Sequence, residues 1–227
     1  MLASPRTFGE RLANRIAHAP LRIERAKPEE MQELGLFRYR IYIEQVGKDA
    51  EHADHANRTL LEPLDAKSVN LIARNADGIM IGAVRISRAS DGWRLPEHCR
   101  QDPWPWVPPH QIACVSRLMV DREIAPLLAT PALFADCFRW GLANSIRLCA
   151  VFCGPALQSL FESYGCQQFD ETYPDRFVGA QVPMLCCLND RAHLSAIGSP
   201  FTSLADRSQP NRRDFAYMRT IRNGHFT

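Results

Sequence analysis

The strongest constraint on the fold is a pair of apolar runs joined by a tight turn. The runs are SVNLIARN and IMIGAVRIS, and Ala76, Asp77 and Gly78 separate them. β-Branched residues favour extended backbone, and Asp-Gly suits the left-handed conformation that a tight hairpin turn requires. The sequence therefore predicts an antiparallel hairpin over residues 68–87.

Strands and helices are expected to alternate around this hairpin. Thr130 followed by Pro131 has the chemistry of a helix N-cap and first helical position, and Gly165 suits a helix C-terminus. The expected elements outside the hairpin are strands at 21–24, 111–120, 148–153 and near 182–188, and helices at 28–47, 130–146 and 155–165. This order predicts a mixed sheet of the α/β or α+β class.

The length and hydrophobic content suit one folded domain. With 227 residues, 46% of them hydrophobic, the chain can bury one sizeable core. We expect the domain over 21–190, a helical extension packed on it at 1–20, and a polar extension at 191–227 with little core of its own. Residues 90–110 are rich in proline and tryptophan, which predicts a packed irregular excursion or a lid.

Charge and cysteine usage exclude several functional classes. The net charge is only +2, so neither nucleic acid nor an anionic membrane surface is indicated as a partner. No stretch approaches the roughly 20 apolar residues that span a bilayer, and the N-terminus lacks the apolar core of a secretory signal. The eight cysteines contain no CxxC pair and most lie in apolar runs, which indicates small buried hydrophobic residues in a reducing compartment. We expect a cytoplasmic protein without a transmembrane segment.

Two arginines stand in strands that are otherwise apolar. Arg85 and Arg117 would be costly to bury without a carboxylate or phosphate partner, because a desolvated charge must be paired. Glu62 and Asp65, just before the hairpin, are the candidate partners, and Arg38 in the first helix is a further charge of the same kind. These residues form either a structural network that ties the helix to the sheet or a site that contacts substrate, and both interpretations stay open.

Several short motifs follow one another in a fixed order. They are Arg38, Tyr42, Glu44 and Gly47 in the helix, then the acids Glu62 and Asp65, then Gly82 with Arg85, then Ser116-Arg117, and finally Tyr164-Gly165 and VPMLC. From about Phe37 to Leu188, this order resembles the autoinducer synthases and their relatives, the N-acyl amino acid synthases, within the GNAT acyltransferase superfamily.

The resemblance implies a GNAT-like fold and an N-acyltransferase. Such an enzyme would move a medium- or long-chain fatty acyl group from a carrier thioester to the amine of an amino acid or a similar small amine. Lys48 and Cys114 stand where autoinducer synthases carry a tryptophan and a glutamate, and both differences disfavour homoserine-lactone synthesis. Lactone-type autoinducer synthesis, short-chain acetylation and a non-catalytic GNAT-like binding module are the alternative functions.

Acyl transfer needs a neutral amine, a stabilised oxyanion and a proton for the leaving thiolate. The resemblance implies that backbone N–H groups of the central strand polarise the thioester carbonyl, and that a splay between two strands admits the carrier arm. Phe161 stands where many GNAT enzymes have a tyrosine, so the sequence identifies no general acid. Catalytic roles are predicted for Arg38, Glu62, Asp65, Arg85 and Arg117, with Glu62 or Asp65 as base, and substrate contacts for Tyr42, Trp104, Cys114, Val115, Ser116, Leu118 and Phe152.

Other reactive side chains receive plainer interpretations. Cys114 has no activating histidine nearby in the sequence, so we expect an inert thiol rather than a nucleophile. His52, Asp54 and His55 carry metal-binding atoms, but no ligand set with zinc spacing accompanies them, and no metal is expected. The tryptophans within 90–110 either line an acyl pocket or pack the proline-rich segment.

No cofactor is expected to remain bound, because the acyl donor is a thioester of acyl carrier protein or of coenzyme A. Ordinary GNAT enzymes grip the coenzyme A pyrophosphate with a glycine-containing loop before a helix. Here the equivalent connection, DREIAPLLATPALF from Asp121, contains no glycine, although Arg122 and the helix start at Thr130-Pro131 offer a weaker cradle. The sequence therefore predicts acyl carrier protein as the preferred donor.

Overall fold

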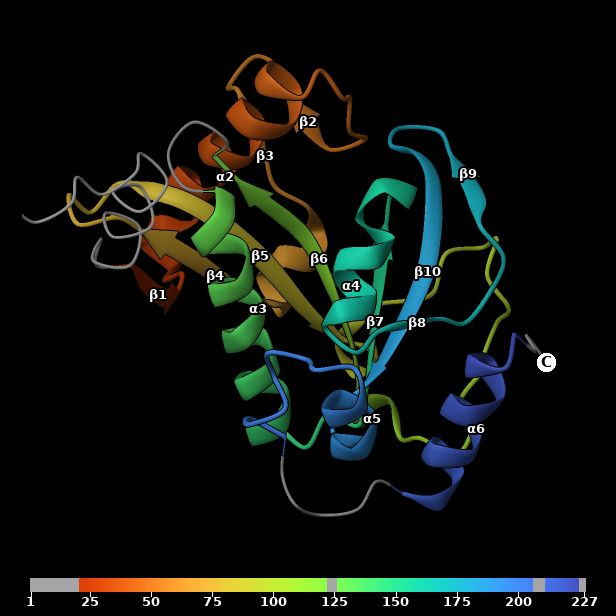
Figure 1. The fold of residues 1–227 in the computed structure, drawn as a ribbon. Helices are drawn as coiled ribbons and strands as arrows, with labels where there is room; N and C mark the ends of the chain where they lie inside the picture. The colour runs from red at the N-terminus through yellow and green to blue at the C-terminus, as the bar shows by residue number, and fades with distance from the viewer. Residues whose placement is uncertain (1–20, 122–125, 206–210, 225–227) are drawn as a thin grey trace, which may run out of the picture.

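The chain folds around one large mixed sheet (Figure 1). This computed structural model describes residues 21–121, 126–205 and 211–224, so the helical extension predicted at 1–20 lies outside the described residues. In the described part, the eight-stranded sheet has the order β1-β4-β5-β6-β7-β10-β8, and β9 pairs with β10. The strands are β1 (Arg22–Arg25), β4 (Val69–Arg74), β5 (Met80–Arg88), β6 (Ile112–Val120), β7 (Leu148–Cys153), β8 (Gln167–Gln168), β9 (Tyr173–Asp175) and β10 (Gly179–Cys187).

The helices connect these strands and cover both faces of the sheet. The longer ones are α2 (Met31–Tyr39), which continues into the π-helix η2 (Arg40–Gln45), α3 (Pro126–Ala143), α4 (Gln158–Ser163), α5 (Arg191–Ala196) and α6 (Arg212–Arg222). Short pieces are η1 (Pro28–Glu30), η3 (Pro63–Lys67), η4 (Ala89–Asp91), η5 (Pro109–Gln111), η6 (Pro155–Leu157) and a small hairpin of β2 (Ala53–Asp54) and β3 (Thr59–Leu60). None of the described helices is long and apolar enough to cross a bilayer.

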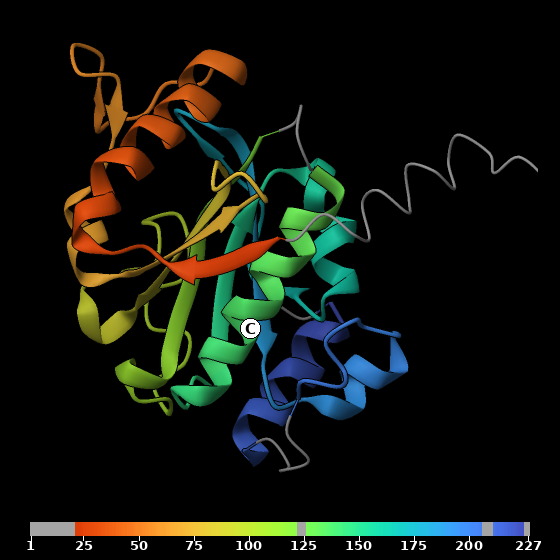
Figure 2. The same ribbon diagram turned by 90° about the vertical axis from the view of Figure 1, so that its left-hand side faces the viewer.

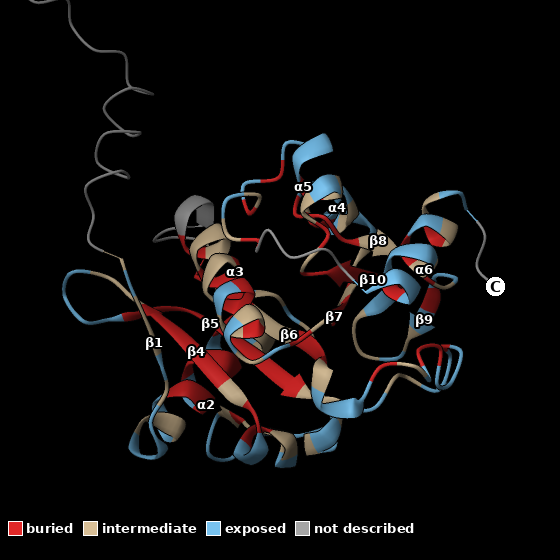
Figure 3. Ribbon diagram, turned by 90° about the horizontal axis from the view of Figure 1, so that it is seen from below, coloured by how far each residue is buried: buried red, intermediate tan, exposed pale blue. Residues whose placement is uncertain are grey.

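Three layers result, with the sheet in the middle (Figure 2). On one face, α3, α4 and α5 pack their apolar side chains against β4 to β7. On the other face, α2 covers β4 and β5, while α6 and the proline-rich segment cover β7 and β10. The central strands β4, β5 and β6 are therefore buried along most of their length (Figure 3). Burial of apolar surface on both faces is the main stabilising contribution to such a fold.

The predicted hairpin is present as the antiparallel pair β4 and β5. Asn75 shapes its turn, because its side-chain oxygen accepts the backbone N–H groups of Asp77 at 3.0 Å and Ile79 at 2.9 Å. Gly78 has a φ of +78°, in the left-handed region that glycine adopts at little cost. The Asp-Gly signal thus marked the turn correctly.

The first helix begins and ends where the sequence indicated. Pro28 opens η1, and the Glu30 carboxylate accepts the backbone N–H of Lys27 at 2.9 Å, which satisfies one free donor at the helix start. The chain leaves the helix at Gly47, whose φ is +70°. The last six residues form a π-helix instead of the expected α-helix, and such wide turns are often found at functional sites.

The predicted start of the helix expected at 130–146 is wrong. Thr130-Pro131 was expected to open it, but α3 already begins at Pro126 and contains Pro131 in its second turn. Both prolines satisfy the same first-position preference, and the earlier one is used. A proline inside a helix removes one backbone hydrogen bond. Burial of Ala129 and Leu133, both 0% exposed, offsets this loss.

The segment after Arg191 packs onto the sheet instead of building a core of its own. Leu194 of α5 and Phe201 join the cluster around α3 and α4, while Met218 and Ile221 of α6 pack on the opposite face. Gly165 shows how closely α5 approaches, because a Cβ there would meet Leu194 Cδ2 at 2.3 Å. Because residues 191–227 are mostly polar, these few buried apolar contacts could not be predicted from the sequence.

Candidate functional site

Strands β6 and β7 pair in parallel over only four residues of each strand. Their register runs from Ile112↔Leu148 to Val115↔Val151, and beyond this point the two strands separate (Figure 1). A bulge in β6 lies where they part, because Arg117 and Leu118 together oppose Val84 of β5. Arg117 takes a φ of +54°, which is strained for a residue with a side chain. Bulges bend and twist the strand that carries them, which accounts for the splay.

The splay opens into a cleft of about 760 Å³. Its two walls are the ends of β6 and β7, and it reaches both faces of the sheet, with Glu62 and Arg85 on one face and Phe134 and Phe161 on the other. Eight residues predicted to be catalytic or to contact substrate line this cleft: Tyr42, Glu62, Arg85, Val115, Ser116, Arg117, Leu118 and Phe152. Segments up to 110 residues apart in the sequence therefore meet at one opening.

The short helix η3 sets the spacing of the two acids beside the cleft. Glu62 is its N-cap residue, and the Asp65 side chain accepts the Glu62 backbone N–H at 2.8 Å. This local bond fixes both carboxylates on one turn, with Asp65 behind Glu62. The arrangement follows from the Glu-Pro-x-Asp sequence, because proline at the first helical position favours the turn.

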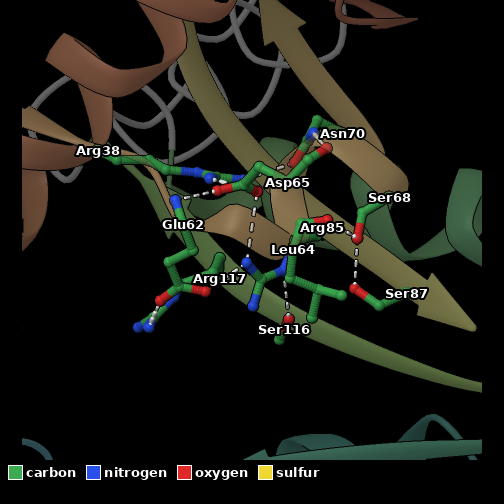
Figure 4. A network of polar contacts seen from close by, with 10 residues as sticks. All are labelled: Arg38, Glu62, Leu64, Asp65, Ser68, Asn70, Arg85, Ser87, Ser116 and Arg117. Carbon is green, nitrogen blue, oxygen red and sulfur yellow. Dashed lines mark hydrogen bonds and ion pairs between the residues drawn. The ribbon is translucent and has the colours of Figure 1, made fainter. Parts of the chain in front are cut away.

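Asp65 and Arg38 form the buried inner part of the network (Figure 4). Arg38 Nη1 donates to Asp65 Oδ1 at 2.9 Å, and its Nη2 donates to Asn70 Oδ1 at 2.8 Å. Arg38 is 1% exposed and Asp65 is 4% exposed, so water cannot replace either partner. Burial lowers the pKa of Arg38, and the nearby Asp65 carboxylate partly reverses that shift.

Glu62 and two arginines form the outer part, which faces the cleft (Figure 4). Both Arg85 and Arg117 donate to the Glu62 carboxylate, and Arg85 Nε also donates to Ser116 Oγ at 3.2 Å. The Arg117 guanidinium lies 5.8 Å from the centre of the Tyr42 ring and remains 26% exposed. Burial lowers the pKa of Arg117 and raises the pKa of Tyr42.

The complete network carries an excess of positive charge. Three guanidinium groups, those of Arg38, Arg85 and Arg117, face the two carboxylates of Glu62 and Asp65. Removing two carboxylates from water is costly, and the ion pairs with these arginines offset that cost. The partly exposed Arg117 leaves part of the positive charge accessible from the cleft.

Four of the predicted residues do not line the cleft. Arg38 and Asp65 lie behind Glu62 and Arg85, so they act on the cleft only through the network. Trp104 is 2% exposed and packs on Phe169 at 5.2 Å, which is a structural role under the proline-rich segment. Cys114 is 1% exposed, and burial raises the pKa of its thiol to about 12, which makes it a poor nucleophile.

Several residues of the cleft were not found from the sequence. Tyr173 and Asp175 come from β9, and His98 comes from the proline-rich segment. Lys48 was mentioned above only because autoinducer synthases carry a tryptophan at this position. Its side chain reaches the loop before β10, where Nζ donates to Val178 O at 3.1 Å. Pro174 made strand β9 hard to predict, although a proline is compatible with an edge strand, and among the described strands β9 pairs only with β10.

A small apolar cavity adjoins the cleft on the α3 side of the sheet. It measures about 40 Å³ and shares Val115, Phe134 and Val151 with the cleft wall. Its other walls come from strands β5, β6, β7 and β10, from α3, from the turn that follows α4, and from Phe201. Among the described residues, no cluster of three or more His, Cys, Asp or Glu side chains is placed to hold a metal ion.

No protein-family model matches this chain, and no curated protein matches it either. Solved structures match over most of the chain. The AHL synthase LasI has a TM-score of 0.61 at 18% identity, covering 79% of this chain and 95% of that protein. FeeM, an N-acyl amino acid synthase from uncultured soil microbes, has a TM-score of 0.57 at 13% identity, with coverages of 82% and 99%.

The CoA-dependent acyl-homoserine lactone synthase BjaI, solved with SAM and isopentyl-CoA, has a TM-score of 0.61 at 16% identity and coverages of 88% and 99%. At such low identity, these comparisons establish the fold. The chain has the GNAT-like fold that its sequence motifs predicted, shared with acyl-homoserine lactone synthases and an N-acyl amino acid synthase.

Proposed function

We propose that this protein is an N-acyltransferase. It moves a medium- or long-chain fatty acyl group from a carrier thioester to the amine of an amino acid or a similar small amine. The observation that carries the proposal is the cleft at the β6–β7 splay, with a charged network on one face of the sheet and an apolar cavity on the other. The shared fold with synthases that acylate amines supports the same reaction class.

The thioester would lie in the splay between β6 and β7. Backbone groups of β6 beyond Val115 have no partner strand on the β7 side, since the described pairing stops there. Backbone N–H groups on that edge can donate to the carbonyl oxygen as it becomes an oxyanion. The bulge at Arg117 alters the direction of these groups at the place where the strands part.

The amine would be deprotonated on the charged face. Glu62 lines the cleft, and Arg85 and Arg117 fix the position of its carboxylate. From this position it would take the ammonium proton directly or through one water. Asp65 is buried behind it and would position Glu62 and Arg85. Arg117 is 26% exposed and lines the cleft, so its guanidinium could pair with a carboxylate on the acceptor, and an amino acid carries such a group whereas a simple amine does not.

The acyl tail would pass to the apolar face. Val115, Phe134 and Val151 line both the cleft and the apolar cavity, so a chain entering between the strands meets hydrocarbon on all sides. An acetyl group would leave this cavity unused, which favours a longer chain. The cavity is small, and a long chain would need Phe134 or its neighbours to change rotamer.

Mass spectrometry of lipid extracts from an expressing host tests this proposal. We expect N-acyl amino acids that are absent from cells expressing Glu62→Gln, a variant that keeps side-chain shape but removes the base. An acyl lactone would instead indicate autoinducer synthesis, and a short acetylated amine would indicate the acetyltransferase function. If purified protein with acyl thioesters and mixed amino acids formed no acylated product, the enzyme proposal would be refuted in favour of a binding module.

The preferred donor is proposed to be acyl carrier protein, as the missing glycines of DREIAPLLATPALF suggest. Residues 122–125 lie outside the described part, and α3 starts at Pro126. An acidic carrier meeting arginines on this domain should associate more slowly as salt rises. The test compares kcat/KM for one acyl chain on both carriers at low and high ionic strength. Equal or better use of the coenzyme A thioester, without stronger salt dependence for the protein carrier, would contradict this choice.

A further inference from the structure

The proposed reaction leaves one charge without an evident partner, namely the departing sulfur. As the C–N bond forms and the C–S bond breaks, the electron pair remains on sulfur as a thiolate. Phe161 lines the cleft but offers only a hydrocarbon ring, so α4 supplies no donor there. Thiolate departure is faster when a fixed hydrogen-bond donor is aimed at the sulfur.

Tyr173 places a phenol in the same cleft from a different element. It lies on β9, where it pairs with Gln181 of β10, and it is 8% exposed. His98 stacks on its ring, with 5.2 Å between the ring centres and 24° between the ring planes. Phe152, the first residue of β7 beyond the parallel pairing, contacts the ring edge-on with centres 6.4 Å apart. These two contacts hold the phenol next to the point where the strands separate.

The Tyr173 hydroxyl is uncommitted, unlike that of the other tyrosine in the cleft. Tyr42 is hydrogen-bonded to Arg117. No hydrogen bond joins the Tyr173 hydroxyl to any residue that the structure describes. Buried tyrosine hydroxyls usually find a partner, so a free one that faces a cleft points to a ligand group. Burial raises the pKa of Tyr173, and the phenol therefore remains a protonated donor at all working pH values.

We propose that Tyr173 donates a hydrogen bond to the leaving sulfur and stabilises the thiolate in place of the donor missing at Phe161. This role rests on the acyltransferase function proposed above. The ammonium loses one proton to Glu62, which passes it to bulk water before the attack. The nitrogen loses a second proton as the amide forms, and water carries this proton to the thiolate. One ammonium and one thioester therefore give one amide, one thiol and one released proton.

Other donors in the cleft are less suited to this role. The Ser116 hydroxyl is held by Arg85 on the charged network, where the amine is expected. Cys153 also lines the cleft, but its thiol contacts Met184 Sδ at 3.6 Å, and thiols are weak donors. Tyr173 is the neutral oxygen donor that remains near the end of β7.

The test compares Tyr173→Phe with the wild type on two thioesters of the same acyl chain. One has an alkyl leaving group, pantetheine, and the other has an aryl leaving group, thiophenol, whose thiolate needs less stabilisation. We expect the variant to lose on the order of 100-fold in kcat with the pantetheine thioester and far less with the thiophenyl thioester. Tyr217→Phe, which alters a phenol on α6 outside the cleft, should leave both rates unchanged.

Each other outcome overturns the inference. An equal loss on both thioesters, in a variant with wild-type melting temperature, would assign Tyr173 to acceptor binding. An unchanged rate on both would show that the sulfur needs no donor from β9. If the wild type released no thiol from either thioester, the proposed function would fail together with this inference. An active wild type beside an unaffected variant overturns the Tyr173 role alone.

Discussion

Asp65 is the residue on which most of the charged network depends. One carboxylate oxygen receives Arg38 and, more weakly at 3.4 Å, Arg85, while the other accepts the Glu62 backbone N–H. The side chain therefore joins α2, η3 and β5 at one point. A residue in this position contributes to stability and to the geometry of the cleft at the same time.

Asp65→Ala should lower the free energy of unfolding by about 3–5 kcal/mol, because it leaves the buried Arg38 without a counter-charge. Urea denaturation measures the change. Asp77→Ala, in the exposed hairpin turn, is the matched control and should stay within about 0.5 kcal/mol of the wild type. If both variants were equally stable, Arg38 would have to be paired or hydrated in another way.

The site residues show what sequence reasoning can reach. Glu62, Arg85 and Arg117 were predictable because charges in or beside apolar strands require one another. Tyr173 and His98 gave no such signal, since each is an isolated residue in an irregular or proline-containing stretch. Trp104 and Cys114 were predicted to contact substrate, but Trp104 is buried against Phe169, and Cys114 lies where β6 is still paired with β7.

At the scale of elements, the bulge in β6 determines the cleft. Arg117 is held at a φ of +54° while Ser116, its neighbour, continues the pairing with Arg85. No glycine marks this bulge, so it could not be predicted from the amino-acid sequence. The same holds for the π-helix η2, because the apolar spacing of an α-helix and that of one wider turn are nearly indistinguishable over six residues.

Arg117→Gly should be more stable than Arg117→Ala by about 1 kcal/mol, the reverse of the usual order, because only glycine adopts the left-handed region without strain. Both variants lose the ion pair with Glu62, so their difference reports on the backbone alone. Thermal unfolding measures it, and Ser116→Gly against Ser116→Ala serves as the control. There alanine should be the more stable. The same order at both positions would argue against a strained bulge.

The remaining elements were largely predictable because their signals are local. Runs of apolar residues gave the main strands, and Asp77-Gly78 and Gly165 gave a turn and a helix end. The start of α3 failed because two prolines compete for one position, and only packing of the whole helix decides between them. Strand order and the parallel pairing of β6 with β7 depend on contacts distant in sequence and could be expected only through the family resemblance.

At the scale of the whole molecule, two buried acids tie α6 to the domain: Asp190, which pairs with Arg222 of α6, and Asp214 in α6 itself. Asp214 is 1% exposed and accepts hydrogen bonds from Arg147 Nε at 2.8 Å, Arg147 Nη2 at 2.7 Å and Trp106 Nε1 at 2.9 Å. Arg147 precedes β7, and Trp106 belongs to the proline-rich segment. The C-terminal helix thereby stabilises two segments that lead toward the cleft.

Asp214→Ala should lower the free energy of unfolding by about 3 kcal/mol. This is the lower end of the range for a broken buried ion pair, because Arg147 stays 19% exposed and can be partly hydrated. Hydrogen exchange should then show loss of protection in both α6 and residues 104–107. Asp214→Asn keeps one side-chain oxygen that can accept a hydrogen bond, so this variant should lose less stability and less protection than Asp214→Ala. Loss of protection in α6 alone would indicate that the C-terminal segment is independent of the domain.

The central claim is that acyl transfer takes place in the splay between β6 and β7. Gly154 lines this cleft, has an ordinary φ of −65°, and a Cβ added there meets no atom within 4 Å. A larger side chain should therefore fill the cleft without unfolding the protein.

The direct measurement is amine-dependent release of thiol from a fatty acyl thioester by the wild type, by Gly154→Phe and by the exposed control Ala56→Phe. The account predicts release by the wild type and the control, and a loss of about 100-fold for Gly154→Phe at an unchanged melting temperature. Full activity of a folded Gly154→Phe protein would contradict it.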